Sequence, residues 1–379
     1  MRYLPHTAED RKQMLAKIGV ASVDALYNNV PKECNLNPKL NLPNTKPESE
    51  VEGIFRKFAK HNHPAHSGPF FLGAGCYFHH IPATVDHIIQ RSEFLTSYTP
   101  YQPEVSQGTL AVIFQFQSMI AALTGQEIAN ASMYDGATSA AEAALMAKRI
   151  TKKENIKIHG VLHPHYKETM ETYLQVIGGK VEEGEPDANT ACVIVQSPDF
   201  HGNVHAYEEL RKKCDAAGCL LVVVVAELVS LGMLPAPKIA DIVCGEAQSV
   251  GVGMQFGGPH LGFFACKKEY VRQMPGRLCG ATVDANGKRS FVLTLSTREQ
   301  HIRREKATSN ICTNVGLMAT AFTIHMSLLG EEGFKQLARL NHAKACEVAD
   351  KIDALKGFKV VNKTFFNEFV VKTDDLAER

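Results

Sequence analysis

Short, uninterrupted apolar runs separated by helical text constrain the fold of this chain more than any other feature. The runs lie between residues 156 and 266 and read "IKIHGVL", "ACVIVQ", "CLLVVVVAEL", "ADIVCG" and "LGFFAC". Strands that are buried on both faces have such continuous Val, Ile and Leu runs, and helices between consecutive strands imply parallel crossover connections. The sequence therefore predicts an α/β domain with a mainly parallel sheet that carries helices on both faces.

Helical text precedes, separates and follows these runs. Apolar residues at helical spacing predict helices over 82–92, 107–124, 138–150, 166–177 and 206–217. Further along, the segment "GATVDANGKRSFVLT" predicts a β-hairpin, in which Asn286 and Gly287 supply the positive φ angles of a tight turn.

Three parts of the chain are expected. Residues 1–64 form an N-terminal helical arm, in which Thr7 caps a helix over 8–17 and a later short helix carries an apolar stripe suited to docking. Residues 65–310 form the large α/β domain. Residues 311–379 form a linking helix and the start of a small α+β domain, which we expect to be incomplete because one helix and two strands make a marginal core. The docking stripe consists of Val51, Ile54, Phe55 and Phe58.

The composition narrows the class of protein. The 41 basic and 40 acidic side chains leave a formal net charge of +1, which argues against a role in binding nucleic acid or a membrane surface. No apolar run approaches the roughly 20 residues that cross a bilayer, and the start lacks an apolar signal core, so a cytoplasmic protein is expected. Ten scattered cysteines suggest buried free thiols in a reducing compartment, and sixteen histidines lack metal-ligand spacing, so we expect no metal site.

A polar loop, "FLTSYTPYQPEVSQG", is the first candidate for a functional site. Prolines at 100 and 103 prevent helix formation and make the loop rigid, so that its side chains can be held toward a ligand. The alternative is a surface loop that caps the following helix. The candidate side chains are those of Tyr98, Tyr101, Glu104 and Gln107.

Two further stretches suggest anion binding. In "MYDGATSAAEAALMAKR" a helix begins after an Asp-Gly turn, and the free N–H groups at such a start can seat a phosphate near Gly136 and Thr138, although many helices begin this way without a ligand. In "STREQHIRREKATSN" a basic cluster suits a carboxylate clamp; the alternative is a solvated patch whose own glutamates pair with it. The clamp candidates are Arg298, His301, Arg303 and Arg304.

Four segments in this order, "YTPYQPEVSQG", "ANASMYDGATSAAEA", "FGGPHLGFFA" and "REQHIRREKATSNICTN", resemble the P-protein of the glycine cleavage system, and within it the alpha subunit of the two-subunit form. The resemblance implies the fold-type I architecture of pyridoxal-phosphate (PLP)-dependent transferases. It also implies an oxidoreductase of amino-acid catabolism, glycine dehydrogenase (decarboxylating), assembled as an α2β2 heterotetramer. In that enzyme glycine is decarboxylated on PLP held by a lysine of the beta subunit, and the aminomethyl group passes to the lipoyl arm of the H-protein.

The resemblance also implies that this subunit has lost the cofactor lysine. Gln248 stands where the beta subunit has that lysine, and an amide cannot condense with an aldehyde. A PLP enzyme also needs a carboxylate beside the pyridine nitrogen; the matching position falls near Val223, which is apolar, and Glu227 falls about one turn too late. The alternative is that Lys267 or Lys268 is the cofactor lysine.

The chain is therefore expected to be inactive alone and to line a shared site with its polar loop, in which Tyr98 is the best candidate. Gly136, Thr138 and Gln248 are then relics of a cofactor site that bind no PLP covalently. Two rival functions remain open, a self-sufficient PLP-dependent amino-acid decarboxylase and a scaffold subunit that contributes no side chain to catalysis.

Overall fold

The computed structural model describes residues 6–34, 41–95 and 98–373 of the 379-residue chain. The chain divides into two compact units, Met1–His63 and Pro64–Arg379. Among the described residues, no helix is both long and apolar enough to cross a membrane.

The described residues of the first unit form two helices, α1 (Ala8–Ile18) and α2 (Glu48–Ala59), and a short 3-10 turn at Asp24–Tyr27. The capping box expected at α1 is present: the Thr7 hydroxyl accepts a hydrogen bond from the N–H of Asp10, whose carboxylate accepts one from the N–H of Thr7. On α2, the rings of Phe55 and Phe58 are exposed and meet edge to face with centroids 6.4 Å apart. The apolar stripe predicted for this helix is therefore present on its surface.

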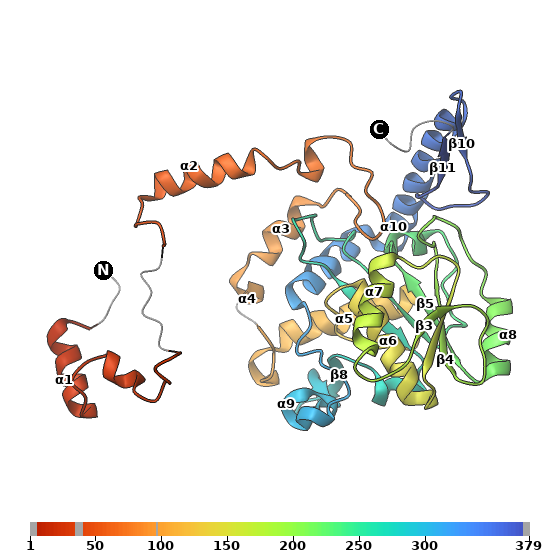
Figure 1. Ribbon diagram of the computed structural model, residues 1–379. Helices are drawn as coiled ribbons and strands as arrows, with labels where there is room; N and C mark the ends of the chain where they lie inside the picture. Colours follow the sequence, from red (N-terminus) through yellow and green to blue (C-terminus); the bar gives the residue numbers. More distant parts are fainter. Residues whose placement is uncertain (1–5, 35–40, 96–97, 374–379) are drawn as a thin grey trace. The chain divides into compact units, whose positions relative to one another are not determined.

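The second unit is built on a seven-stranded sheet in the order β1-β7-β6-β5-β4-β2-β3 (Figure 1). Strands β2 to β6 are parallel to one another, whereas β7 runs antiparallel to both β6 and β1. All five predicted apolar runs are strands, and the predicted mainly parallel sheet is confirmed. The strands are β1 (Ile128–Ala129), β2 (Asn155–His159), β3 (Val181–Glu183), β4 (Thr190–Gln196), β5 (Leu220–Val225), β6 (Ile242–Glu246) and β7 (Gly262–Cys266).

Helices cover both faces of the sheet, because successive side chains of a strand point to opposite faces. Val223 and Val225 of β5 pack in one apolar cluster with side chains of α5, α8 and α10, whereas Val222 and Val224 pack in a second cluster with α6 and α7. The main helices are α5 (Gln107–Thr124), α6 (Gly136–Thr151), α7 (Pro164–Leu174), α8 (Glu208–Ala217) and α10 (Gly316–Asp353). Shorter helices are α3 (Ala83–Ile89), α4 (Ser92–Leu95) and α9 (Gln300–Arg303).

The remaining strands lie outside the main sheet. Strands β8 (Leu278–Val283) and β9 (Arg289–Thr294) form the predicted hairpin, but only Gly287 of the two turn residues has a positive φ angle, of 74°, so the prediction for Asn286 is wrong. Strands β10 (Phe358–Val360) and β11 (Val371–Thr373) pair antiparallel beside the second half of α10. The two helices expected before them are joined into α10, with non-helical backbone at Gly330.

Candidate functional site

Gln248 lies just after β6 at the carboxyl edge of the sheet, and its side chain is 2% exposed. Its amide Nε2 donates a 2.6 Å hydrogen bond to the carbonyl of Val252, and its Oε1 accepts a long one, 3.5 Å, from the N–H of Tyr77. The side chain is therefore engaged with backbone on both sides and presents no amine.

Glu246, the last residue of β6, is buried and accepts three backbone hydrogen bonds. Its Oε2 accepts one of 3.0 Å from the N–H of Gly136 at the start of α6. Its Oε1 accepts two of 2.9 Å, from the N–H groups of Gln248 and Leu261. The start of a helix is where a phosphate would bind, because its N–H groups and the helix dipole favour a negative charge. Here the protein's own carboxylate holds that place.

The rest of the helix start is also engaged. Asp135 caps α6 by accepting a 2.7 Å hydrogen bond from the N–H of Thr138. The phenol of Tyr166 packs so closely on Gly136 that a Cβ built there would lie 2.0 Å from its oxygen. Burial raises the pKa of Tyr166 well above its usual value, so this phenol is neutral and packed. The phosphate seat predicted at Gly136 and Thr138 is thus filled by protein atoms.

These residues do not fit bound PLP. The aldehyde of PLP would face the amide of Gln248, with which it cannot condense. Its phosphate would face the carboxylate of Glu246, and the two negative charges would repel each other.

The two positions considered for a carboxylate at β5 differ in their surroundings. Val223 lies in the middle of the strand, within the apolar core, whereas Glu227 follows the strand's carboxyl end. Glu227 is buried and accepts hydrogen bonds of 2.7 Å from the hydroxyl of Ser249 and 3.0 Å from the N–H of Val229, and His79 Nε2 lies 3.0 Å from its other oxygen. Glu227 therefore bonds to Ser249, the residue that follows Gln248, whereas Val223 lies in the core.

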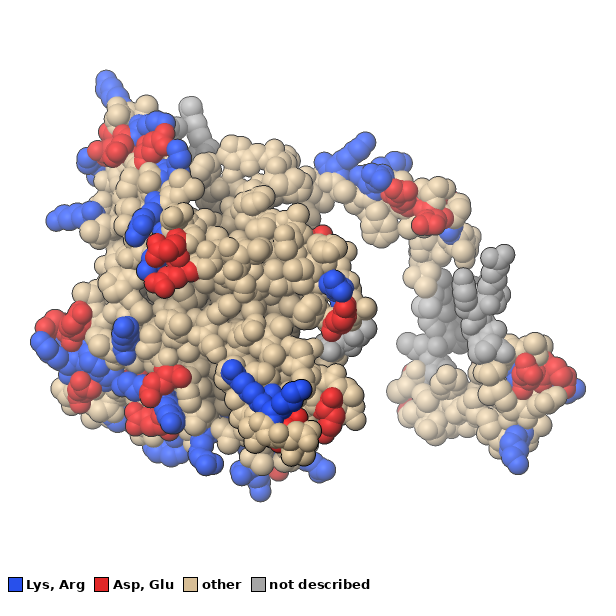
Figure 2. All heavy atoms as spheres, turned by 180° about the vertical axis from the view of Figure 1, so that it is seen from behind, with Lys and Arg blue, Asp and Glu red and all other residues tan. Residues whose placement is uncertain are grey.

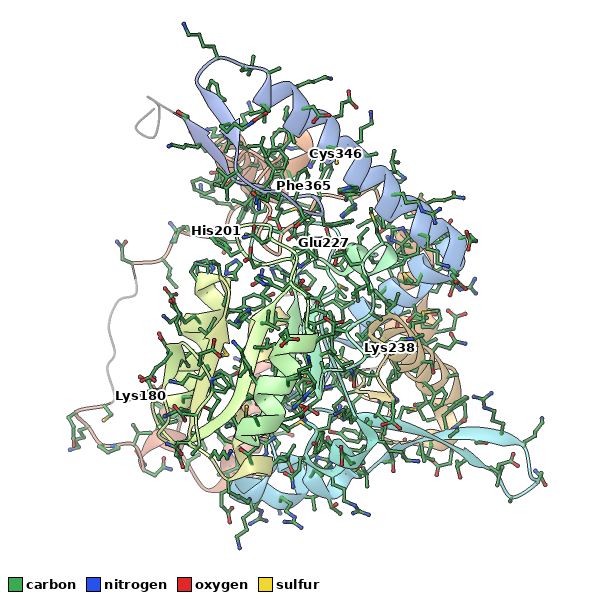
Figure 3. All side chains as sticks on the ribbon, turned by 90° about the vertical axis from the view of Figure 1, so that its right-hand side faces the viewer. Lys180, His201, Glu227, Lys238, Cys346 and Phe365 are labelled. Atoms are coloured by element: carbon green, nitrogen blue, oxygen red, sulfur yellow. The ribbon has the colours of Figure 1, made fainter. Side chains whose placement is uncertain are left out.

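Figure 3 shows the two ends of the sheet. Glu227 and His201 lie at the end near the second half of α10, and Lys180, which precedes β3, lies at the other end. A cavity of about 660 Å³ opens at the α10 end, between residues 70–79, 367–370 and α10. Tyr77 and His79 line this cavity and bond to Gln248 and Glu227 respectively, so they form the wall between the cavity and the buried pair.

The alternative cofactor lysines lie at the wrong edge of the sheet. Because β7 is antiparallel to β6, Gly262 pairs with Glu246 and Cys266 pairs with Ile242, the first residue of β6. Lys267 therefore follows the edge opposite to Gln248, where its ammonium pairs with Asp241. The interpretation of Lys267 or Lys268 as the cofactor lysine is wrong.

The polar loop and the basic segment, which are far apart in the sequence, meet at Arg277. This arginine precedes β8, is 2% exposed, and was not identified from the sequence, because "MPGRLCG" shows one charge between glycines and apolar residues. Its guanidinium donates five hydrogen bonds, to the side chains of Thr99, Tyr101, Glu299 and Thr313 and to the carbonyl of Cys312.

The four loop candidates differ in their surroundings. Tyr98 is 79% exposed and Tyr101 is 56% exposed, and Glu104 is exposed as well. Gln107 instead exchanges two hydrogen bonds, of 2.8 and 2.9 Å, with the backbone of Phe291 in β9. Its amide fixes the hairpin to the start of α5, which leaves the two tyrosines and Glu104 as side chains that face outward.

The four residues proposed for the carboxylate clamp also differ in burial. Arg298 is buried, and its guanidinium donates to the carbonyls of Leu295, Met274 and Gly276. His301 is exposed and packs edge to face on Tyr101, with ring centroids 5.8 Å apart. Arg303 and Arg304 are exposed beside it in sequence. Arg298 thus holds the fold, whereas the other three are exposed, with His301 Nδ1 3.7 Å from Glu299 Oε2.

Comparison with solved structures identifies the class of protein that this fold defines. The structure of a sphingosine-1-phosphate lyase from Burkholderia pseudomallei covers 91% of this chain and 82% of its own, with a TM-score of 0.60 and 14% identity. A glutamate decarboxylase from Lactobacillus brevis covers 92% and 82%, with a TM-score of 0.63 and 12% identity. The fold is that of the fold-type I PLP-dependent enzymes.

Closer relatives identify the family. The family model described as glycine cleavage system P-protein matches residues 1–379. A probable glycine dehydrogenase (decarboxylating) subunit 1 from Azorhizobium caulinodans is 57% identical over 100% of this chain and 88% of its own length, and one from Caulobacter vibrioides is 54% identical over 100% and 87%. The crystal structure of an inhibitor-bound glycine decarboxylase (P-protein) covers 99% of this chain and 88% of its own, with a TM-score of 0.90 and 42% identity. The chain belongs to the glycine cleavage system P-protein family.

Proposed function

We propose that this chain is subunit 1 of a glycine dehydrogenase (decarboxylating) that holds no PLP itself and completes, with its own side chains, an active site on a partner subunit. Relatives that are more than half identical over the whole chain carry the name subunit 1, which implies a partner subunit. The structure of the P-protein at 42% identity supports the same assignment.

One observation supports the proposal that the partner subunit, and not this chain, holds PLP: side chains of this chain occupy the positions where the cofactor would bind. Gln248 replaces the amine that would bind PLP, and Glu246 accepts the helix-start hydrogen bond that a phosphate would accept. PLP, which stabilises negative charge at the amino-acid carbon in such enzymes, is then carried by a lysine of the partner.

The contribution of this chain comes from its outward-facing loop. Tyr98, Tyr101 and Glu104 project from a segment that is fixed at one end by Arg277 and at the other by Gln107. A phenol can orient a polar substrate without adding charge to the site. His301 packs against Tyr101 of this loop, and Arg303 and Arg304 follow His301 in the sequence and are exposed. These three side chains are suited to hold an anionic group such as a carboxylate.

The surface is consistent with a chain that meets another protein. On the face of the second unit seen in Figure 2, basic and acidic side chains lie next to one another, and a broad area carries neither. We propose an α2β2 assembly in the cytoplasm that decarboxylates glycine and passes the aminomethyl group to the lipoyl arm of the H-protein.

Two measurements test this function. The purified chain mixed with PLP should show no visible aldimine band, and borohydride should fix no cofactor to it, whereas the co-purified partner subunit should show both. The assembled enzyme with Tyr98→Phe should catalyse glycine–CO2 exchange more slowly than wild type while its subunits stay associated.

The results distinguish the rival functions. An aldimine on this chain alone would establish a self-sufficient enzyme. Unchanged exchange in the Tyr98→Phe enzyme, together with unchanged exchange in Tyr101→Phe, would establish a scaffold.

A further inference from the structure

Arg277 uses its full donor capacity to join three segments of the chain. Its Nη1 donates to the hydroxyls of Thr99 at 3.1 Å and Thr313 at 2.8 Å. Its Nη2 donates to the hydroxyl of Tyr101 and to the carbonyl of Cys312, both at 3.0 Å. The remaining N–H, on Nε, donates to Glu299 at 3.1 Å. A guanidinium has five N–H donors, and all five are engaged.

The direction of the bond to Tyr101 determines what the phenol can do. Because Arg277 donates to the phenol oxygen, the phenol's own proton is left to be donated to another acceptor. The ring is held from two sides, with the guanidinium carbon 5.0 Å from its centroid and the His301 ring 5.8 Å away. Tyr101 is nevertheless 56% exposed as a residue, so the held phenol lies at the protein surface.

The loop backbone brings a second side chain to the same arginine. The N–H of Tyr101 donates a 2.9 Å hydrogen bond to the carbonyl of Thr99 across Pro100, and this tight turn points both side chains at Arg277. Thr99 also meets Thr313 at 3.2 Å. The loop is therefore fastened at two points, and its position depends on the guanidinium.

We propose that Arg277 is a positioning residue, which fixes the hydroxyl of Tyr101 as a hydrogen-bond donor toward an anionic oxygen, such as the substrate carboxylate, in the shared active site. The proposal rests on the function proposed above. Arg277 cannot contact the substrate itself, because its donors are all engaged and it is buried. A lysine cannot replace it, because one ammonium cannot reach three segments with planar geometry.

The test is a double-substitution cycle in the assembled two-subunit enzyme, with glycine–CO2 exchange as the readout. Arg277→Lys and Tyr101→Phe should each lower the turnover number by on the order of tenfold or more, as expected when a reacting partner is misplaced. The double variant should be no slower than the slower single variant, because both changes remove the same hydroxyl contact. Arg211→Lys is the matched control: Arg211 is a partly buried arginine that bonds to Asp241 and the carbonyl of Cys219, and its replacement should lower thermal stability without slowing exchange.

Each outcome separates this proposal from the proposed function. If Tyr101→Phe slows exchange but Arg277→Lys does not, or if the two effects multiply, Arg277 is not a positioning residue for Tyr101 and the shared site stands. If neither Tyr98→Phe nor Tyr101→Phe slows exchange, the loop contributes nothing and both proposals fail. Should Arg277→Lys not assemble, Thr99→Val keeps the guanidinium and its bond to Tyr101 but removes the other of the two points at which the loop is fastened to it. That variant should slow exchange less than Tyr101→Phe does and should add nothing to it; an effect that multiplies with that of Tyr101→Phe would overturn the proposal.

Discussion

Gln248 and Glu246 are two residues apart at the carboxyl end of β6, and their side chains bond to different parts of the backbone. The amide of Gln248 stands where a PLP enzyme has the lysine that binds the cofactor. The carboxylate of Glu246 bonds to the start of α6, where the cofactor's phosphate would bind. Because the two obstacles are on different side chains, reversing one of them leaves the other in place. A lysine at 248 would also be buried close to the carboxylates of Glu246 and Glu227, where its charged form is favoured over the neutral amine that attacks an aldehyde.

We therefore expect Gln248→Lys alone to restore no cofactor binding. The variant mixed with PLP should show no aldimine absorbance, and intact mass after borohydride reduction should equal that of the variant. The partner subunit, treated in parallel, provides the positive control. A mass increase corresponding to one reduced PLP would contradict the role assigned to Glu246.

His260 gives the surroundings of Glu246 a pH dependence. The carboxylate of Glu246, 3.6 Å from its Nδ1, raises the pKa of His260 above its usual value, against the opposing effect of burial. A group with a raised folded-state pKa contributes stability that is complete below its unfolded pKa of about 6.5 and is lost as the pH rises through the folded pKa. The difference in melting midpoint between wild type and His260→Asn should thus shrink from pH 6 toward pH 8.5, by differential scanning fluorimetry, and a difference that grows with pH would contradict this contact.

Of the residues around the candidate site, sequence analysis singled out Gln248 but missed Glu246 and Arg277. Gln248 was found because it is an amide within a segment that resembles the one carrying the cofactor lysine in the beta subunit. Glu246 and Arg277 were missed because a single charge at a strand end is typical of a solvated edge, and only the tertiary structure shows that each is buried among donors or acceptors from several segments. Arg298 was misjudged for the converse reason: its charged neighbours suggested an exposed cluster, but its guanidinium turns inward to three carbonyls.

Among the elements, β7 packs tightly against the start of α6. Gly262, its first residue, lies against the start of α6, where a Cβ would be 2.4 Å from the carbonyl oxygen of Asp135 and 2.6 Å from the hydroxyl of Ser139. The N–H of Met133 also donates a 2.8 Å hydrogen bond to the carbonyl of Gly262. A backbone atom cannot rotate away, so β7 and α6 would have to separate.

Gly262→Ala should therefore destabilise the protein by about 1–3 kcal/mol or more, the usual cost of overpacking a core. Urea unfolding should show a lower midpoint at unchanged slope. Gly108→Ala is the control, since nothing lies within 4 Å of a Cβ there and the residue is in the first turn of α5. That change should be neutral or stabilise by up to about 1 kcal/mol, and equal losses in both variants would contradict the packing argument.

At this scale the sequence predicted most of the fold, because long continuous apolar runs and helical spacing both reflect burial directly. The predicted helix over 107–124 has the observed bounds of α5. Strands β1 and β3, with two and three residues, carry too few side chains for a pattern, and they exist because neighbouring strands offer an unpaired edge. The direction of β7 is likewise not encoded in "LGFFAC", yet it decides which edge Lys267 occupies.

For the whole molecule, the arm in the first unit provides a test of assembly that is independent of catalysis. Phe55 and Phe58 expose large apolar rings on one side of α2, and such exposed aromatic side chains mark surfaces that bind other proteins. Phe55→Ala should weaken association with the partner subunit by about 1–3 kcal/mol, or roughly 5- to 150-fold in dissociation constant. Sedimentation velocity of the mixed subunits would measure it.

Lys57→Ala on the same helix is the control, because it changes a charged residue beside the stripe. It should leave association within about 0.5 kcal/mol of wild type, as surface substitutions usually do. Equal affinity of the Phe55→Ala variant and wild type would show that α2 docks elsewhere or not at all.

The carboxylate of Glu246 at the start of α6 makes the stability of this protein independent of cofactor supply. A pocket that waits for a ligand gains stability from it by mass action, and a shortage of that ligand leaves part of the population loose. Glu246 belongs to the chain itself, so its carboxylate always occupies this helix start. The melting midpoint of this chain should therefore be the same in the absence of the vitamin-derived cofactor and at any concentration of it. Newly made copies would then be ready to pair with their partner even when the vitamin is scarce.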